Sequence, residues 1–276
     1  MVVNELDNIF VTFGAGRSGW IGAAKRITAE AEKTGLFGFC FNLDENWLKT
    51  WDPTIYEIGL NLRKNQPPRG FGYWTWKPSV LLWAHLNFPN HQIVYVDAGS
   101  EFRFSQVELD NLHAALLCAL KNKGLAFSLP NFPEEKWTKK DVIEKLSVPK
   151  HHLQSGQVQS GFLVLPPILE RIDLLSRWRS LALEKNGFYF TDEVLLKSSD
   201  LFIENRHDQS ILSCLWKEIN LTSKSDLTDP SVYSDFGLIA SRNNSILSSN
   251  SPRGLRILLK LLNLIFDKIT SLSKLY

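Results

Sequence analysis

The sequence contains few cysteines, and they are widely spaced. Among 276 residues only Cys40, Cys118 and Cys214 occur. Their number is odd and no two of them form a Cys-x-x-Cys pair, so the pattern argues against a disulfide framework and against a zinc knuckle. Free thiols of this kind are typical of a protein that works in a reducing compartment.

Long apolar runs are missing as well. No stretch of about 18 uncharged apolar residues occurs, so we expect no transmembrane helix. The first residues carry neither the basic nor the apolar segment of a secretory signal peptide. Together with the free thiols, these absences predict a cytoplasmic protein.

The chain also lacks a strong excess of charge of one sign. It has 31 Lys and Arg against 29 Asp and Glu, a formal charge of +2, so its bulk charge does not favour binding to nucleic acid. An apolar share of 44% and a charged share of 22% exclude a disordered, collagen-like or coiled-coil chain. The length allows one large domain or two small ones.

Short apolar runs alternate with segments of helical periodicity. The runs predict strands at residues 8–13, 37–42, 92–96, 125–129 and 158–165. The periodic segments predict helices at residues 19–33, 54–64, 78–86, 106–121, 167–186 and 208–217. This alternation predicts an α/β fold with a mostly parallel sheet flanked by helices.

The character of the chain changes near its end. We expect one domain over residues 1–218, a polar loop or covering segment over 219–251, and an amphipathic helix over 252–276. Residues 253–276 carry Leu, Ile and Phe at helical spacing, with five basic residues and one acid beside them. Such a helix either packs on the protein's own core or lies on an anionic membrane surface, which would make the protein peripheral at the inner face of a membrane.

A glycine-rich turn follows the first predicted strand. Gly14, Gly16 and Gly19 form a Gly-x-Gly-x-x-Gly pattern between a strand and a helix, the setting of a dinucleotide-binding turn. The nearest acid past the second strand, Asp44, lies 25 residues beyond Gly19, whereas the ribose-binding acid usually lies about 20 residues on. Three interpretations stay open: a nicotinamide or flavin site in an oxidoreductase, contact with another nucleotide diphosphate, and a structural turn.

An aspartate ends the third predicted strand. Asp97 follows an apolar run and is followed by Ala98 and Gly99. Ligands of open α/β sheets gather at the carboxyl ends of strands, and a carboxylate there can hold a hard cation. Glu101 is a candidate second carboxylate. The alternative is an aspartate that begins an ordinary turn.

Two polar clusters and one aromatic segment are further candidates. Residues 157–161 offer groups that can hydrogen-bond hydroxyls, or form an ordinary loop. In residues 205–210, His207 and Asp208 can act as metal ligand, base or sugar-binding groups, or Asp208 caps a helix. In residues 70–78, Trp74 and Trp76 can stack on a base or sugar and Lys77 can neutralise phosphate, or the aromatics fill space under a loop.

The order of these segments resembles a known family. Lys77-Pro before a helix, a strand ending in Asp97-Ala-Gly, then Gln-Ser-Gly-Phe at residues 159–162 and His-Asp-Gln-Ser at 207–210 look like bacterial polysaccharide and capsule glycosyltransferases of the glycosyltransferase-A fold. The series is more distantly similar to glycogenin and galactosyltransferase-like enzymes. It spans about residues 8–217. The resemblance implies a Rossmann-like half and sugar transfer from a nucleotide-sugar donor to a glycan or lipid-linked glycan acceptor in surface polysaccharide biosynthesis.

The residues and the resemblance together predict a site. The candidate catalytic residues are His207, Asp208 and Gln209. The candidate donor-binding residues are Thr12, Phe13, Gly14, Arg17, Lys77, Asp97, Ala98 and Gly99. The candidate acceptor-binding residues are Trp76, Gln159, Ser160 and Gly161.

The resemblance also implies a divalent cation, Mn²⁺ or Mg²⁺. Asp97 matches the first acid of the family's Asp-x-Asp element, but Gly99 stands at the second. A metal site then needs a further ligand from Glu101 or His207. Because Gly99 breaks the motif, a non-catalytic glycan-binding module is a third candidate function, besides the glycosyltransferase and the oxidoreductase.

Overall fold

The structure, a computed structural model, describes residues 8–65, 70–219, 221, 223–224, 232–233, 237–245, 247 and 262. Its central sheet has the strand order β2-β1-β3-β7. These strands are β1 (Asn8–Gly14), β2 (Phe39–Asp44), β3 (Gln92–Val96) and β7 (Phe162–Leu165). β1 runs parallel to β2 and β3, and β7 is antiparallel to β3. The predicted α/β fold with a mostly parallel sheet flanked by helices is confirmed.

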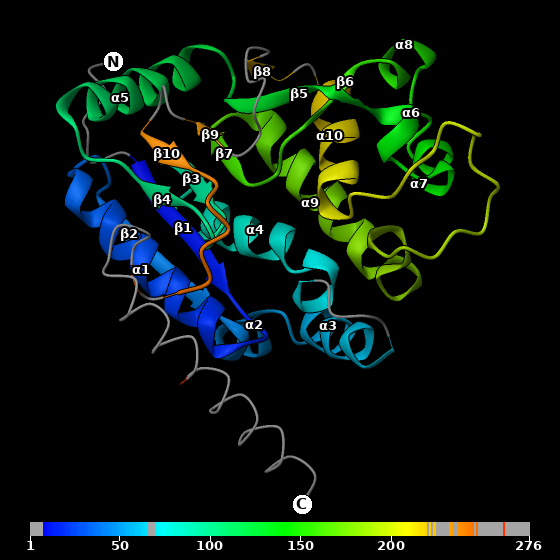
Figure 1. The fold of residues 1–276 in the computed structure, drawn as a ribbon, viewed down its shortest axis with the longest axis horizontal. Coiled ribbons are helices and arrows are strands. Elements are labelled where there is room, and N and C mark those ends of the chain that lie inside the picture. Colours follow the sequence, from blue (N-terminus) through cyan, green and yellow to red (C-terminus); the bar gives the residue numbers. More distant parts are fainter. Residues whose placement is uncertain are drawn as a thin grey trace, which may run out of the picture.

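Helices cover both faces of this sheet (Figure 1). On one side lie α1 and α5, and on the other lie α3, α4, α9 and α10. Their bounds are Ser18–Thr34, Gln106–Lys121, Pro53–Asn65, Lys77–Asn87, Leu169–Leu183 and Asp208–Glu218. The helices form two hydrophobic clusters, one on each face.

The strand sequences explain why both faces are covered. Ile9 and Val11 on β1 pack into one cluster, and Phe10 between them packs into the other. Successive side chains of a strand point to opposite faces, so a continuous apolar run buries apolar groups on both sides. Every residue of β1 and β3 is buried. A central strand of this kind leaves only its ends available for a polar site.

Two small sheets and several short helices flank the central layer. The small sheets have the orders β4-β10-β9 and β6-β5-β8. Their strands are β4 (Glu101–Phe102), β10 (Leu238–Ile239), β9 (Val232–Tyr233), β6 (Gly156–Val158), β5 (Ala126–Pro133) and β8 (Ser223–Lys224). The remaining helices are α2 (Glu45–Trp51), α6 (Glu134–Trp137), α7 (Lys140–Lys145), α8 (Lys150–Leu153), and the 3₁₀ segments η2 (Phe71–Trp74) and η3 (Glu184–Phe190).

Two predicted elements were wrong in their extent. The single strand expected at residues 158–165 is two strands, β6 and β7, which belong to different sheets. The chain turns between them, and the Gly161 carbonyl accepts a hydrogen bond from the Asp97 N–H at 2.9 Å. The helix expected at 167–186 ends at Leu183, because Lys185 and Asn186 adopt φ of 49° and 53°, which no right-handed helix accommodates.

The segment after α10 is described in part. Within residues 237–245, β10 pairs with β4 in one of the small sheets, and the Asn243 N–H donates to the Gly99 carbonyl at 2.9 Å. The amphipathic helix predicted for residues 252–276 lies outside the described residues, Leu262 excepted. Within the described part of the chain, every helix is too short or too polar to cross a bilayer.

Gly14 allows helix α1 to approach the end of β1. A Cβ atom added at Gly14 would lie 2.4 Å from the Trp20 carbonyl oxygen and 2.8 Å from the Ala24 Cβ. This first glycine of the predicted nucleotide turn is therefore required for strand–helix packing. Gly16, with φ of 89°, makes the left-handed turn that follows.

Candidate functional site

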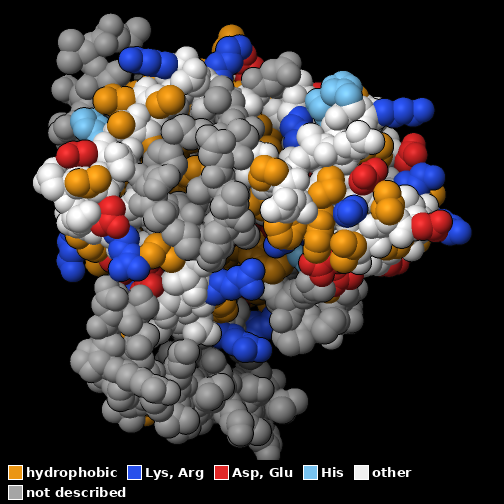
Figure 2. Space-filling model, turned by 45° about the horizontal axis from the view of Figure 1, so that its top comes forward, with side chains coloured by type: hydrophobic (Ala, Val, Ile, Leu, Met, Phe, Trp, Pro, Cys, Tyr) orange, Lys and Arg blue, Asp and Glu red, His pale blue; other side chains and the backbone are white. Residues whose placement is uncertain are grey.

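A cavity of about 1180 Å³ opens at the carboxyl ends of β1 and β3. The turn after β1, the η2 segment, the Asp97 turn and three later segments (residues 159–161, 204–209 and 239–244) line it. Ligands of open α/β sheets bind at this edge, because loops from neighbouring strands converge there. Figure 2 shows basic side chains beside a hollow near the middle of one face of the molecule.

The lysine that begins helix α4 lies at the centre of the site. Lys77 is 1% exposed, and its Nζ lies 2.6 Å from Asp208 Oδ2 and 3.2 Å from Asp97 Oδ1. It also donates to the carbonyl and the hydroxyl of Ser160, both at 3.3 Å. Burial alone lowers the pKa of the Lys77 ammonium, but attraction by the two carboxylates outweighs it and the net pKa is raised. Lys77 therefore stays charged.

The Asp97 carboxylate accepts a hydrogen bond from a buried tyrosine and is also exposed to the cavity. The Tyr95 hydroxyl donates to Asp97 Oδ1 at 2.7 Å. Burial, together with the charge of Asp97, raises the pKa of Tyr95 well above its usual value, so this phenol remains a donor. The Asp97 side chain is nevertheless 41% exposed. Its carboxylate is thus held in place and still accessible from the cavity.

Asp208 and His207 lie at the start of helix α10. The Asp208 side chain is 7% exposed. His207 adopts φ of 55°, a left-handed conformation that is uncommon outside functional or turn positions. Its ring lies between Tyr73, at a centroid distance of 5.0 Å, and Trp74, at 5.4 Å.

The hydrogen bonds of His207 define its neutral tautomer. Nδ1 lies 2.8 Å from the Phe190 carbonyl oxygen, which can only accept. Nδ1 therefore carries the hydrogen, and in the neutral ring Nε2 is the basic nitrogen. Histidine with this arrangement is suited to accept a proton from a substrate hydroxyl.

Four arginines also line the cavity: Arg17, Arg63, Arg206 and Arg242. With Lys77 they make five cationic side chains against three carboxylates, Asp97, Glu204 and Asp208. Because two of those carboxylates already contact Lys77, the four arginines give the cavity a surplus of positive charge. The lining is suited to an anionic ligand.

The structure brings most predicted site residues together. Those that line the cavity are Phe13, Arg17, Trp76, Lys77, Asp97, Ala98, Gly99, Gln159, Ser160, Gly161, His207, Asp208 and Gln209. These residues come from segments up to about 200 positions apart in the chain, as the α/β topology requires. Their convergence supports the prediction of a single site.

Three predicted site residues lie outside the cavity lining. Thr12 is fully buried, and its hydroxyl donates to the Val96 carbonyl at 2.7 Å, which joins β1 to β3. Gly14 packs against helix α1, as described above. Glu101 is 2.9 Å from the buried Arg26 guanidinium. These contacts give all three residues structural roles.

Trp76 lines the cavity but is unsuited to stack on an acceptor. It is 5% exposed, its ring stacks on Phe13 at a centroid distance of 4.1 Å, and its indole N–H donates to the Phe71 carbonyl. This arrangement matches the alternative in which the aromatics fill space under a loop. Trp74, in contact with His207, is a half-buried aromatic at the cavity, as is Trp20.

The side chains available as metal ligands do not fit the divalent cation that the resemblance implies. Over the described ranges, no three His, Cys, Asp or Glu side chains cluster in a way that could hold a metal ion. A Cβ atom at Gly99 would lie 3.1 Å from the Trp20 ring and 3.2 Å from the Arg242 Cα, so a second aspartate there would require these neighbours to shift by a few tenths of an ångström. Of the predicted set of Asp97, Glu101 and His207, Glu101 is paired with Arg26.

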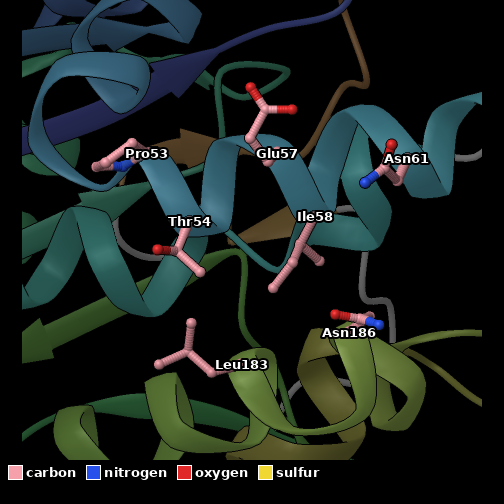
Figure 3. A pocket seen from close by; sticks show the side chains of 7 residues that line it. All are labelled: Pro53, Thr54, Glu57, Ile58, Asn61, Leu183 and Asn186. Atoms are coloured by element: carbon pink, nitrogen blue, oxygen red, sulfur yellow. The ribbon is translucent and has the colours of Figure 1, made fainter.

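A second hollow lies between helix α3 and the end of helix α9 (Figure 3). Its lining residues are Pro53, Thr54, Glu57, Ile58, Asn61, Leu183 and Asn186. This lining has a single ionisable side chain, Glu57, and lacks the convergent charged groups of the larger cavity. The larger cavity is therefore the candidate functional site.

Sequence reasoning missed several residues of the site. Arg63 lies in the last turn of helix α3, and Arg242 lies in the polar segment after α10. Nothing in their local sequence distinguishes them from other exposed arginines. Tyr95 was hidden in an apolar strand, although a hydroxyl two residues before a strand-end aspartate lies on the same face and can reach it. Arg206 could have been predicted as a site residue, because it directly precedes His207 in the sequence.

Comparisons with known proteins do not establish a family. No family profile and no curated protein matches the chain. It is similar to mouse xyloside xylosyltransferase 1 in its apo form, with 12% identity, 80% of this chain and 85% of that chain covered, and a TM-score of 0.41.

Two structures of the galactosyltransferase LgtC also match. A complex with donor and acceptor sugar analogues has 15% identity over 75% of this chain and 70% of that chain, with a TM-score of 0.32. An active-site mutant of LgtC has 15% identity over 87% and 84%, with a TM-score of 0.32. Both proteins are glycosyltransferases by name, but TM-scores this low establish neither a common fold nor a common activity.

The contact of Lys77 with two carboxylates predicts a large effect of its removal. Lys77→Met leaves the buried Asp208 without a cation, and we expect it to lower the free energy of unfolding by about 3–5 kcal/mol. Adding Asp208→Asn removes the unpaired charge and should restore at least half of that loss. Urea unfolding of both variants measures this. Equal stability of Lys77→Met and the unsubstituted protein would contradict the buried ion pair.

Proposed function

We propose that the chain is a glycosyltransferase of the glycosyltransferase-A type, which moves a sugar from a nucleotide-sugar donor to a glycan acceptor. The observation that supports this most is the convergence of all four segments of the resemblance on one cavity at the carboxyl ends of β1 and β3. Lys77, Asp97, Ser160 and Asp208 come from those four segments, and Lys77 contacts the other three.

The charge of the cavity suits the donor. A nucleotide-sugar carries a diphosphate, which becomes the leaving group and gains negative charge as the glycosidic bond breaks. Arg17 and Arg63 are exposed and line the side of the cavity next to the turn after β1. Arginine binds phosphate oxygens in a bidentate manner, so these side chains are suited to hold the diphosphate and stabilise its charge.

The start of helix α10 suits the acceptor. With its ring neutral and the hydrogen on Nδ1, His207 can take the proton of the attacking hydroxyl on Nε2, which lies 3.9 Å from the Asp192 carboxylate. The Asp208 carboxylate is instead paired with the Lys77 ammonium at 2.6 Å. We therefore assign proton transfer to His207 and orientation of the transferred sugar to Asp208 and Gln209.

Gln159 adds a further acceptor contact. Its side-chain oxygen is buried at the cavity and makes no hydrogen bond with any described residue. A buried polar atom in this state is stabilised when a ligand hydroxyl donates to it. Gln159 is therefore a proposed recognition residue for a sugar hydroxyl.

A donor screen tests the proposal. Purified protein is incubated with nucleotide-sugars of several bases and sugars, and release of the nucleoside diphosphate is measured. We expect hydrolysis of at least one donor, and Asp97→Asn should lower that rate about 100-fold without unfolding the protein, because a preorganised electrostatic group is lost. The exposed Asp200 lies outside the cavity, so Asp200→Asn is the matched control.

Binding measurements with a nicotinamide dinucleotide, nucleoside diphosphates and glycans separate the other candidate functions. Binding of a nicotinamide dinucleotide, with no binding of any nucleoside diphosphate, would favour the oxidoreductase. Binding of neither, together with binding of a glycan, would favour the non-catalytic module. Normal turnover by Asp97→Asn would contradict the central role of Asp97.

His207 is the test of the acceptor side. His207→Ala should lower transfer about 100-fold or more, since general base catalysis is lost. Affinity for the nucleoside diphosphate, measured by calorimetry, should be retained, because His207 is assigned to the acceptor. His151→Ala changes an exposed histidine outside the cavity and serves as the control. Equal losses of affinity and activity would move His207 to the donor side.

The resemblance also carries a proposed biological setting: surface polysaccharide synthesis of the capsule type, hexosyl transfer, and a cytoplasmic position with contact to the membrane through residues 253–276. Five basic residues there suit an anionic lipid surface. We expect the protein to float with phosphatidylglycerol vesicles at low salt, and a variant with the five basic residues changed to Gln not to float. Equal flotation of both would contradict the proposed contact.

A further inference from the structure

The proposed donor carries a diphosphate, and the structure assigns its neutralisation to side chains alone. We infer that the chain binds a nucleoside diphosphate without a divalent cation, and that the Lys77 ammonium is the permanent cation between Asp97 and Asp208. This inference rests on the proposed function, and it specifies how the same cavity recognises its ligand.

The first argument is the position of Lys77. Its Nζ contacts Asp97, Asp208 and Ser160, and the side chain is 1% exposed. A divalent cation binds through ionised carboxylates, and the two carboxylates at this site already hold a cation between them. The Nζ also lies 5.2 Å from the centre of the Tyr95 ring, which adds a cation–π contact. A metal bound between Asp97 and Asp208 would have to displace this buried ammonium.

The second argument is the structure of the turn after Asp97. The buried Arg26 of helix α1 donates to the carbonyls of Ala98 and Ser100, both at 2.9 Å, and pairs with Glu101 at 2.9 Å. A guanidinium thus holds this turn in shape. The chain has glycine, without a carboxylate, at position 99, and the Trp20 ring and Arg242 backbone pack closely against it.

The third argument is the charge that remains for a ligand. Glu204 is the one carboxylate of the lining that is not in contact with Lys77, and four arginines share that lining. Arg63 is placed by a hydrogen bond to the Gly16 carbonyl at 3.1 Å, at the turn where helix α1 begins. Arg206 is held over the rings of Phe132 and Trp137, at 4.8 and 5.4 Å. These arginines supply the positive charge that a diphosphate requires.

Calorimetry tests the inference directly. UDP, GDP, ADP and TDP are titrated into the full chain, first with EDTA and then with Mn²⁺ and with Mg²⁺. For the nucleotide that binds, we expect the Kd in EDTA and in either metal to agree within about threefold. Binding that is lost in EDTA and restored by Mn²⁺ or Mg²⁺ would overturn the inference and leave the proposed function standing. Absence of binding under all conditions would overturn both.

One substitution and its control test whether a cavity arginine neutralises the diphosphate in place of a metal. In EDTA, Arg63→Gln should weaken nucleotide binding about tenfold, since a charge-assisted contact to phosphate is lost. Lys64→Gln changes the neighbouring exposed cation, which lies outside the cavity lining, and should leave the Kd unchanged. Equal effects of the two substitutions would show a general charge effect and would overturn the assignment to the cavity.

Discussion

The site depends on one ion pair network, in which the ammonium of Lys77 lies between the carboxylates of Asp97 and Asp208. Two carboxylates this close to a shared position repel each other, and burial of an ion without a partner is costly. Lys77 offsets both effects. It joins the end of β3 to the start of α10, and through Ser160 to the turn before β7. One charge therefore links three segments, two of which are also joined by the hydrogen bond from the Asp97 N–H to the Gly161 carbonyl.

The fold supplies the framework on which this network forms. Parallel strands β1 and β3 end at the same edge of the sheet, so the turns that follow them meet there. β7 runs antiparallel to β3, and the residues before it therefore arrive at that edge as well. Helices cover both faces of the sheet, and the large cavity lies at this edge.

The amino-acid sequence predicted the fold class and the main elements because apolar periodicity is local. Strands β1 and β3 and helix α5 agree closely with the predicted ranges, since each begins and ends at a clear change in patterning. The break between β6 and β7 was missed because residues 158–165 are nearly all compatible with a strand. Its cause is tertiary: Gly161 pairs with Asp97 from a distant part of the chain.

The sequence predicted the charged residues at the centre of the candidate site but missed arginines at its edge. Asp97, Lys77 and Asp208 lie in conspicuous local settings, such as a strand end or a helix start, whereas Arg63 and Arg242 do not. Thr12 and Gly14 were placed in the site because they neighbour it in sequence. In the structure, Thr12 instead hydrogen-bonds the neighbouring strand, and Gly14 lies where helix α1 packs against β1. Which polar residues face a cavity is a property of tertiary structure.

The most direct test is a crystal structure of the chain with the nucleoside diphosphate that it binds, grown with Mn²⁺ in the solution. Our account predicts the diphosphate in the cavity at the ends of β1 and β3, in contact with the arginines of its lining. It also predicts the Lys77 ammonium between Asp97 and Asp208, with no anomalous signal from manganese there. A nucleotide bound elsewhere, or a manganese ion in the place of the ammonium, would contradict it.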